Sequence, residues 1–287
     1  MQTADWENPV HGAAPDHGRR RFLKQVSAGA GALAVAGAAA PMRLLGQSTQ
    51  PVTDADILNF ALNLEYLEAN FYTVATTGKT IDQLGIGISG AGTQGAVSGG
   101  HIVQFSDMER LHIAEQIAND EQAHVKLLRA ALGSAAVAQP AINLDALGVG
   151  FDSQAEFLTL ARAFEDTGVS AYGGAALYIQ NKTYLSVAAR ILSIENQHTA
   201  NIRFQLLHDE VDNGGLGPLD NVDIQVDDYR FFSSTYQGLS VIRSPRQVLD
   251  IVFHCTGCTS GGFYPNGVNS SNLAGLAAVP TPDEYIA

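Results

Sequence analysis

The stretch IANDEQAHVKLLRAAL, residues 117–132, places a carboxylate and an imidazole three residues apart within an otherwise apolar helical pattern. On a helix, this spacing brings Glu121 and His124 to the same face. The stretch SIENQH repeats the spacing with Glu195 and His198. Burying ionisable groups costs free energy unless they are paired or bind a metal. The repeat therefore predicts a polar site inside a helical core.

Four long segments have the apolar period of amphipathic helices, and a shorter fifth helix follows them. The four span residues 53–77, 106–132, 152–180 and 183–207, and the fifth spans residues 244–253. Helix starts are expected at Thr53 or Asp54, at Asp152 or Ser153, and at Ser244 with Pro245 behind it. Residues 78–100 hold eight glycines in 23 residues, which predicts a long loop, with or without a short hairpin. Two helical pairs of this length predict an all-α four-helix bundle with a loop-rich C-terminal tail.

The first and third predicted helices each carry a glutamate in an apolar run, followed seven residues later by a tyrosine. These pairs are Glu65 with Tyr72 and Glu165 with Tyr172. Counted from the helix ends, both glutamates lie at nearly the same height in an antiparallel bundle as the two Glu-x-x-His pairs. A third match to that motif, Glu109 with His112, lies too near the start of its helix to meet them and is interpreted as surface.

Charge balance indicates what such a site would hold. Four buried carboxylates repel one another, and their pKa values rise until some become protonated. Two divalent cations would balance the four charges and use carboxylate oxygens and imidazole nitrogens as ligands. This mixture suits iron and manganese, and we expect two divalent metal ions, with iron ahead of manganese. A buried hydrogen-bonded network without metal is the alternative interpretation.

The segments ALNLEYLEANFY, NDEQAHVKLLRAAL, ARAFEDTGVSAYGGAALYI and RILSIENQHTANIR resemble the ferritin-like-domain proteins of the desiccation-related group, which includes exported bacterial members. The tail sequence SPRQVLDIVF is also similar to that group, and the resemblance spans most of residues 53–270. More broadly, the arrangement resembles the ferritin-like di-iron carboxylate bundles. The resemblance implies a ferritin-like four-helix bundle, a fifth short helix and a dinuclear metal site.

When the ligand positions of the family are transferred to this sequence, the resemblance implies a set of metal ligands. They are Glu65, Glu121, His124, Glu165, Glu195 and His198, with Glu68 as an alternative ligand of the first helix. Glu121 and Glu165 are the usual candidates for bridging the two metals, although the sequence cannot assign the bridges. Tyr72 and Tyr172 are expected either beside the ligands, as hydrogen-bond donors or radical carriers, or as ordinary core tyrosines.

The first fifty residues have the features of an export signal. Basic residues 19–24, RRRFLK, precede an Ala/Gly-rich apolar run over residues 26–40. The pattern resembles the twin-arginine signal, with Gly18 as a departure from it. It predicts an exported protein, periplasmic or extracellular, that folds before it leaves the cytoplasm. A disordered basic tail followed by an Ala-rich linker is the alternative.

The formal net charge of −13 disfavours nucleic acid and anionic lipid as partners. No second hydrophobic span is expected, so the mature chain should have no stable membrane span. Cys255 and Cys258 are the only cysteines, and in an oxidising compartment they could form a disulfide; free thiols remain open.

We expect three parts: an export signal and linker over residues 1–50, the bundle over 51–210, and a C-terminal extension over 211–287 packed on the bundle. The predicted function is an exported dinuclear metal protein that reacts with dioxygen or peroxide in stress protection. The alternative is a non-catalytic stress or desiccation-related protein whose site only stabilises the bundle.

Overall fold

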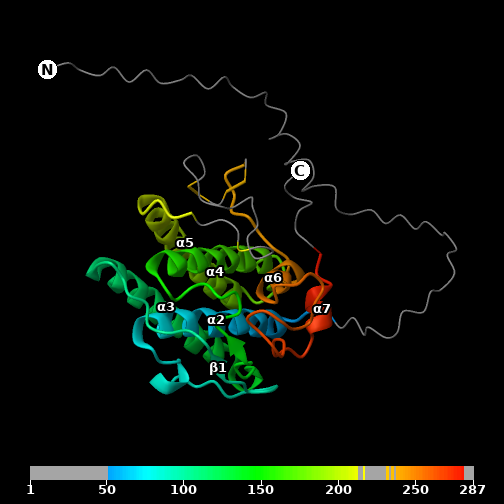
Figure 1. Cartoon of the computed structure of the whole chain (residues 1–287). Helices are drawn as coiled ribbons and strands as arrows, with labels where there is room; N and C mark the ends of the chain where they lie inside the picture. The colour runs from blue at the N-terminus through cyan, green and yellow to red at the C-terminus, as the bar shows by residue number, and fades with distance from the viewer. Residues whose placement is uncertain (1–50, 213–215, 217–230, 233, 236, 281–287) are drawn as a thin grey trace, which may run out of the picture. The chain divides into compact units, whose positions relative to one another are not determined.

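The computed structural model describes residues 51–212, 216, 231, 232, 234, 235 and 237–280. The expected export signal lies outside these described residues. The all-α bundle is confirmed: four long helices lie together and shorter helices follow them in the chain (Figure 1). The helices are α2 (Asp54–Thr77), α3 (Met108–Leu132), α4 (Gln154–Ala175), α5 (Lys182–His208), α6 (Pro245–Val252) and α7 (Leu273–Ala277), with 3-10 turns η1 (Asp82–Leu84) and η2 (Gly133–Ala135).

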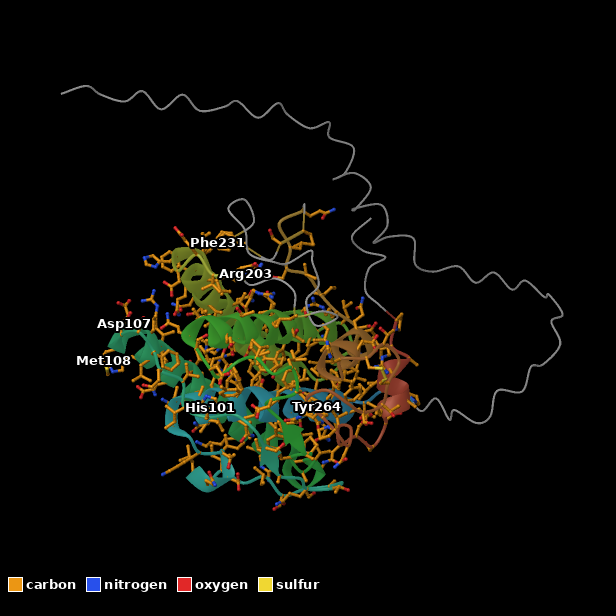
Figure 2. The ribbon with its side chains drawn as sticks, viewed as in Figure 1. His101, Asp107, Met108, Arg203, Phe231 and Tyr264 are labelled. Atoms are coloured by element: carbon orange, nitrogen blue, oxygen red, sulfur yellow. A yellow bond between two sulfur atoms is a disulfide. The ribbon has the colours of Figure 1, made fainter. Side chains whose placement is uncertain are left out.

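The long helices pack closely as two pairs, α2 with α3 and α4 with α5. Helix α2 is buried around most of its circumference, because the C-terminal segment also covers it. There the buried Tyr264, which is labelled in Figure 2, lies against α2 and donates a hydrogen bond to the carbonyl oxygen of Asn63 at 2.6 Å. In contrast, α3 and α5, the helices with the Glu-x-x-His pairs, touch each other at few places. The helices therefore pack closely within each pair, whereas α3 and α5 make few contacts; we call the boundary between α3 and α5 the seam.

Side-chain caps begin three helices where the sequence predicts them. The hydroxyl of Thr53 accepts from Asp56 in a capping box at α2, and Ser153 caps α4. Ser244 forms a second capping box at α6, with Pro245 in its first turn. These caps satisfy backbone N–H groups that have no partner within the helix.

Helix α4 ends at Ala175, five residues before the predicted end at Gln180. The backbone N–H groups of Gln180 and Asn181 donate to the carboxylate of Asp54, each at 2.8 Å. A contact with the start of α2 therefore replaces the helical hydrogen bonds that the apolar period predicts. Gly174 also lies against the backbone of Arg243, where a Cβ atom would come within 2.0 Å of the carbonyl oxygen.

The glycine-rich loop does not form a hairpin. Its strand β1 (Val97–Ser98) instead pairs in parallel with β2 (Ile142–Asn143), in the connection between α3 and α4. Close backbone approach explains the glycines, because a Cβ on Gly95 would lie 2.2 Å from the backbone nitrogen of Ala141. The glycine-rich loop is thus paired with the connection between α3 and α4 rather than with itself.

An aromatic cluster fills the core between α2 and α4. The ring of Phe71 contacts those of Tyr72, Phe151, Phe157 and Phe164, with centroids 5.0–5.3 Å apart. Phe164 in turn contacts Phe263 of the C-terminal segment at 4.9 Å. Side chains far apart in sequence therefore share one core.

A buried group of charges, which the sequence analysis did not identify, joins α4 and α5 to the segment before α6. Asp166 lies 3.3 Å from Arg203 and 3.5 Å from Arg162. Arg203 also donates to the carbonyl oxygen of Phe231 at 3.1 Å, and the two residues lie side by side in Figure 2. Arg243 donates to Ser170 at 2.6 Å.

Cys255 and Cys258 form a disulfide, one of the two states that the sequence left open. Among the residues that the structure describes, no helix is long and apolar enough to cross a membrane.

Candidate metal centre

The six candidate ligands lie at the middle of the bundle and are all buried. Each long helix supplies at least one: Glu65 from α2, Glu121 and His124 from α3, Glu165 from α4, and Glu195 and His198 from α5. The helical spacing brings each Glu-x-x-His pair to the inner face of its helix. The structure therefore brings together all six side chains that the sequence singles out.

The ligand atoms form two overlapping groups, each with all its atoms within 4.8 Å of one another. One group is Glu65, Glu121, His124 and Glu195, and the other is Glu121, Glu165, Glu195 and His198. Glu121 and Glu195 belong to both groups. Glu165, named beside Glu121 as a bridging candidate from the resemblance, belongs to one group.

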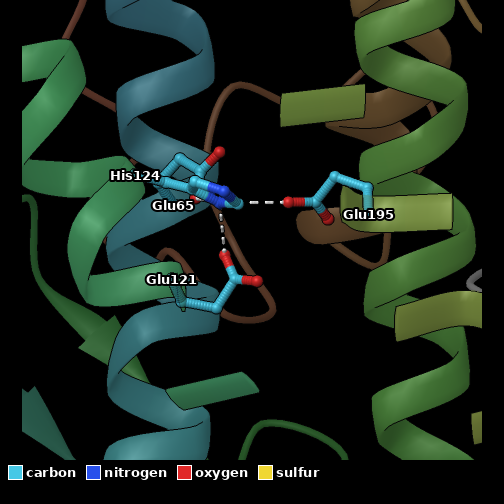
Figure 3. Close-up of side chains that lie close together, drawn as sticks. All are labelled: Glu65, Glu121, His124 and Glu195. Carbon is cyan, nitrogen blue, oxygen red and sulfur yellow. Dashed lines mark hydrogen bonds and ion pairs between the residues drawn. The ribbon is translucent and has the colours of Figure 1, made fainter. Parts of the chain in front are cut away.

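In the first group the imidazole of His124 lies among three carboxylates. Its Nδ1 atom is 3.3 Å from Glu65, 3.4 Å from Glu121 and 3.2 Å from Glu195. Figure 3 shows Glu121 and Glu195 approaching the ring from two directions, Glu195 from the opposite helix pair. A single ion could replace the ring's proton and contact all four side chains.

The second group has the same design around His198. Its Nδ1 atom lies 3.1 Å from Glu121 and 3.4 Å from Glu165. The other ring nitrogen, Nε2, lies 3.3 Å from the Oδ2 atom of Asp120. A carboxylate at this position fixes the orientation of a metal-binding imidazole. Asp120 was not predictable as part of the site, because the 78 residues that separate it from His198 correspond to no local spacing.

Two buried tyrosines hold the glutamates of the opposite helices. Tyr72 on α2 donates to the Oε1 atom of Glu165 at 2.5 Å, and Tyr172 on α4 donates to Oε1 of Glu65. The sequence paired each tyrosine with the glutamate of its own helix. Seven residues span about 10 Å along a helix, so the hydroxyl reaches across to the neighbour instead. Each glutamate thus keeps its Oε2 atom directed at an imidazole.

Burial and mutual repulsion shift the acid–base properties of this cluster. Burial raises the pKa of Glu65 to about 7, although His124 opposes the rise. Burial and the charge of Glu121 raise the pKa of Glu195 well above its usual range. Burial also acts to raise the pKa of Glu121, but hydrogen bonds to both imidazoles outweigh it and hold that pKa below its usual range.

The pKa values of the two imidazoles rise, although burial alone would lower them. Burial acts to lower the pKa of His198, but the charge of Glu165 and its hydrogen-bonded carboxylates outweigh this and raise the pKa to about 12. The carboxylates around His124 raise its pKa in the same way. These shifts all favour the protonated forms of the two imidazoles and of Glu65 and Glu195.

Several buried atoms of the cluster make no hydrogen bond of normal geometry within the described part of the chain, although most of them lie within about 3.5 Å of a neighbouring imidazole or carboxylate. They are Oε2 of Glu65, Oε1 of Glu121, Oε2 of Glu165, both carboxylate oxygens of Glu195 and Nδ1 of His198. Folded proteins pair nearly all buried polar atoms, so a set of this size at one place needs a partner. Carboxylate oxygens and imidazole nitrogens at these spacings suit divalent cations, and the residues therefore fit a pair of metal ions.

Glu68 lies beside this cluster but belongs to neither four-residue group. Its side chain is buried, and a Cβ on Gly168 would lie 3.2 Å from its Oε1 atom and 3.0 Å from Oε2 of Glu195. The missing side chain of Gly168 thus leaves room for two carboxylates. The third sequence match, Glu109 with His112, is exposed, as predicted.

A sequence model of the ferritin-like domain family matches residues 53–208, more than half of the chain. The match covers all four long helices and all six candidate ligands. A search among curated proteins finds no match.

Proposed function

The chain belongs to the ferritin-like domain family, and from that premise we propose that it is an exported protein that binds a dinuclear iron or manganese centre. The ligands in this proposal are Glu65, Glu121, His124, Glu165, Glu195 and His198, with iron ahead of manganese. The observation that carries the proposal is the set of buried carboxylate oxygens that make no hydrogen bond and that two overlapping groups of side chains bring close together.

Bound metal would supply redox chemistry with dioxygen or peroxide, which suits a role in oxidative-stress protection. The chain itself contributes the arrangement of ligands. Tyr72 and Tyr172 hold one oxygen of each outer glutamate, so that the other oxygen faces the metal positions. Glu121 and Glu195 supply charge to both positions, and burial of all four carboxylates keeps bulk water out.

Export and stress protection are proposals that rest on the sequence. The twin-arginine-like residues 19–24 support export, because that route carries folded proteins and so suits a chain that takes up metal in the cytoplasm. The proposed partner is a small oxidant, and the strongly negative charge supports the absence of a nucleic-acid partner.

Metal content tests the site. The purified protein is loaded with ferrous or manganous ion without oxygen, freed of excess metal and analysed for metal per chain. We expect two ions in the wild type and a loss of both in a Glu121→Ala/His124→Ala variant, because Glu121 belongs to both groups. The matched control is Glu109→Ala/His112→Ala, which removes the same motif from the exposed start of the same helix and should retain two ions.

Reactivity then separates an enzyme from a structural site. Iron-loaded protein is mixed with peroxide or dioxygen, and oxidation is followed by absorbance over repeated additions. Turnover supports the redox proposal. Two bound ions with no spectral change would favour the non-catalytic alternative, whereas a wild type without metal would overturn the dinuclear site itself.

A further inference from the structure

The buried site reaches solvent only narrowly, and it does so at its imidazoles. Among the six candidate ligands, His124 is 7% exposed and His198 is 6% exposed, whereas the four glutamates are at most 1% exposed. A cation that enters from outside therefore meets a histidine first.

Two cavities lie along the thin seam between α3 and α5, and each reaches one of these histidines. A cavity of about 210 Å³ is bounded by His198, and one of about 470 Å³ is bounded by His124. The close packing of α2 on α3 and of α4 on α5 closes the sides within each pair. The C-terminal segment covers α2 at Tyr264 and α4 at Phe263. On this side of the bundle, therefore, cavities reach two of the six candidate ligands.

The two cavities differ in chemistry. Three isoleucines line part of the His198 cavity, but Gln116, Gln197 and Asn201 add polar groups and Asp120 adds a negative charge. Aliphatic side chains, among them Leu127 and Ile191, dominate the His124 cavity, and its charged group is the cation Arg190. A divalent cation is attracted to a carboxylate such as that of Asp120 and is repelled by a guanidinium group.

We propose that the polar cavity at Asp120 is the entrance through which the divalent cation reaches the buried site. The inference rests on the proposed metal-binding function and adds a docking position outside the six ligands. In this position the carboxylate of Asp120 and the amide oxygens of Gln116 and Asn201 take up the hydrated cation before it passes to His198.

The position of Asp120 supports this role. Its side chain is 38% exposed, so it meets both solvent and the site. Its Oδ2 atom lies 3.3 Å from Nε2 of His198, and on the opposite side of the ring Nδ1 lies 3.1 Å from Glu121. One imidazole therefore separates an exposed carboxylate from the buried ones. An exposed negative charge at the mouth of a cavity also raises the rate at which cations arrive.

A purely orienting role for Asp120 makes a different prediction. If Asp120 only holds the ring of His198, its loss weakens the affinity of the loaded site. If it receives the incoming cation, its loss slows uptake while the final metal content stays the same. The rate of metal uptake and the metal binding at the end of uptake therefore distinguish the two roles.

Uptake of cobalt(II) provides the measurement. Metal-free full-length protein is mixed with cobalt(II) without oxygen, and visible absorbance is followed by stopped flow. Asp120→Asn removes the charge, and its control is Glu115→Gln at an exposed position of the same helix. Asn201→Trp fills the polar cavity, and its control is Ser193→Trp in the apolar cavity.

We expect Asp120→Asn and Asn201→Trp to slow uptake about tenfold or more at low ionic strength, with two cobalt ions still bound at the end. The two controls should stay within a factor of about two, and added salt should reduce the difference between Asp120→Asn and wild type.

Three results would overturn the inference. Unchanged rates in both cavity variants would mean that metal enters elsewhere, and slower uptake in Ser193→Trp alone would move the entrance to the His124 cavity. An unchanged rate with weaker final binding in Asp120→Asn would leave that residue an orienting role. If the wild type binds no cobalt, the proposed metal-binding function is refuted as well. The three results above refute only the proposed entrance, so the two failures can be told apart.

Discussion

Replacing Tyr172 with phenylalanine tests how the bundle directs its carboxylates. The hydroxyl of Tyr172 donates to Oε1 of Glu65, while Oε2 of the same carboxylate lies 3.3 Å from Nδ1 of His124. In the Tyr172→Phe variant, Oε1 stays buried and loses this donor, and the carboxylate is free to rotate away from the metal position. The change removes one oxygen atom from a side chain that otherwise keeps its shape.

The expected magnitude follows from the charge of the acceptor. A hydrogen bond to a charged group contributes about 1.5–3 kcal/mol, against about 1 kcal/mol for one between neutral groups. Loss of a group that orients a ligand typically weakens metal binding by about 10–100-fold. We therefore expect Tyr172→Phe to bind one of its two ions 10–100-fold more weakly.

The matched control is Tyr264→Phe. This tyrosine is also buried, at 0% exposure against 8% for Tyr172, and its hydroxyl donates at 2.6 Å to the backbone carbonyl of Asn63 rather than to a site carboxylate. The control should lose about 1 kcal/mol of unfolding free energy and keep the metal affinity of the wild type.

Competition titration with a chelator measures metal affinity, and urea unfolding of the metal-free proteins measures stability. The reasoning is refuted if Tyr172→Phe and Tyr264→Phe bind metal with the same affinity. It is also refuted if the loss of metal affinity in Tyr172→Phe is fully explained by a lower unfolding free energy of that variant.

Three further predictions concern pH, space and packing. Burial raises the folded pKa of Glu65 from 4.5 to about 7, so the metal-free fold binds the extra proton between these pH values. The contribution of Glu65 to the unfolding free energy should therefore fall by roughly 3 kcal/mol as pH rises through that window; urea midpoints of wild type and Glu65→Gln check this, and equal pH slopes would contradict it. Gly168→Ala places a Cβ 3.0 Å from Oε2 of Glu195, so it should weaken metal binding even though alanine favours a helix by about 1 kcal/mol. A more stable variant with unchanged metal content would disprove this steric argument. Phe71→Ala removes the centre of the aromatic core and should cost about 3–5 kcal/mol in urea unfolding, and a loss below about 1 kcal/mol would show that the cluster adds little.

Local features of this protein were predictable from its sequence. The caps at Thr53, Ser153 and Ser244 depend on side chains that bond backbone groups three residues away. The Glu-x-x-His pairs depend on the helical period alone. Counting from helix ends also predicted that the two lone glutamates meet these pairs, because a regular helix rises by a constant amount per residue.

The arrangement across the helices was not predictable in this way. Each tyrosine holds the glutamate of another helix, across 93 residues for Tyr72 and 107 residues for Tyr172. The choice of Glu195 as the second shared carboxylate and the contact of Asp120 with His198 depend on how far one helix is rotated against the next. The parallel pairing of the glycine-rich loop with residues 142–143 likewise depends on where α2 and α3 place their connections.

The sequence by itself therefore determined which residues face the interior and at what height, because the period and rise of a helix fix both. Only the tertiary structure decided which of those residues touch. Rotation about a helix axis depends on the packing of all its neighbours, and no spacing along one helix contains that information.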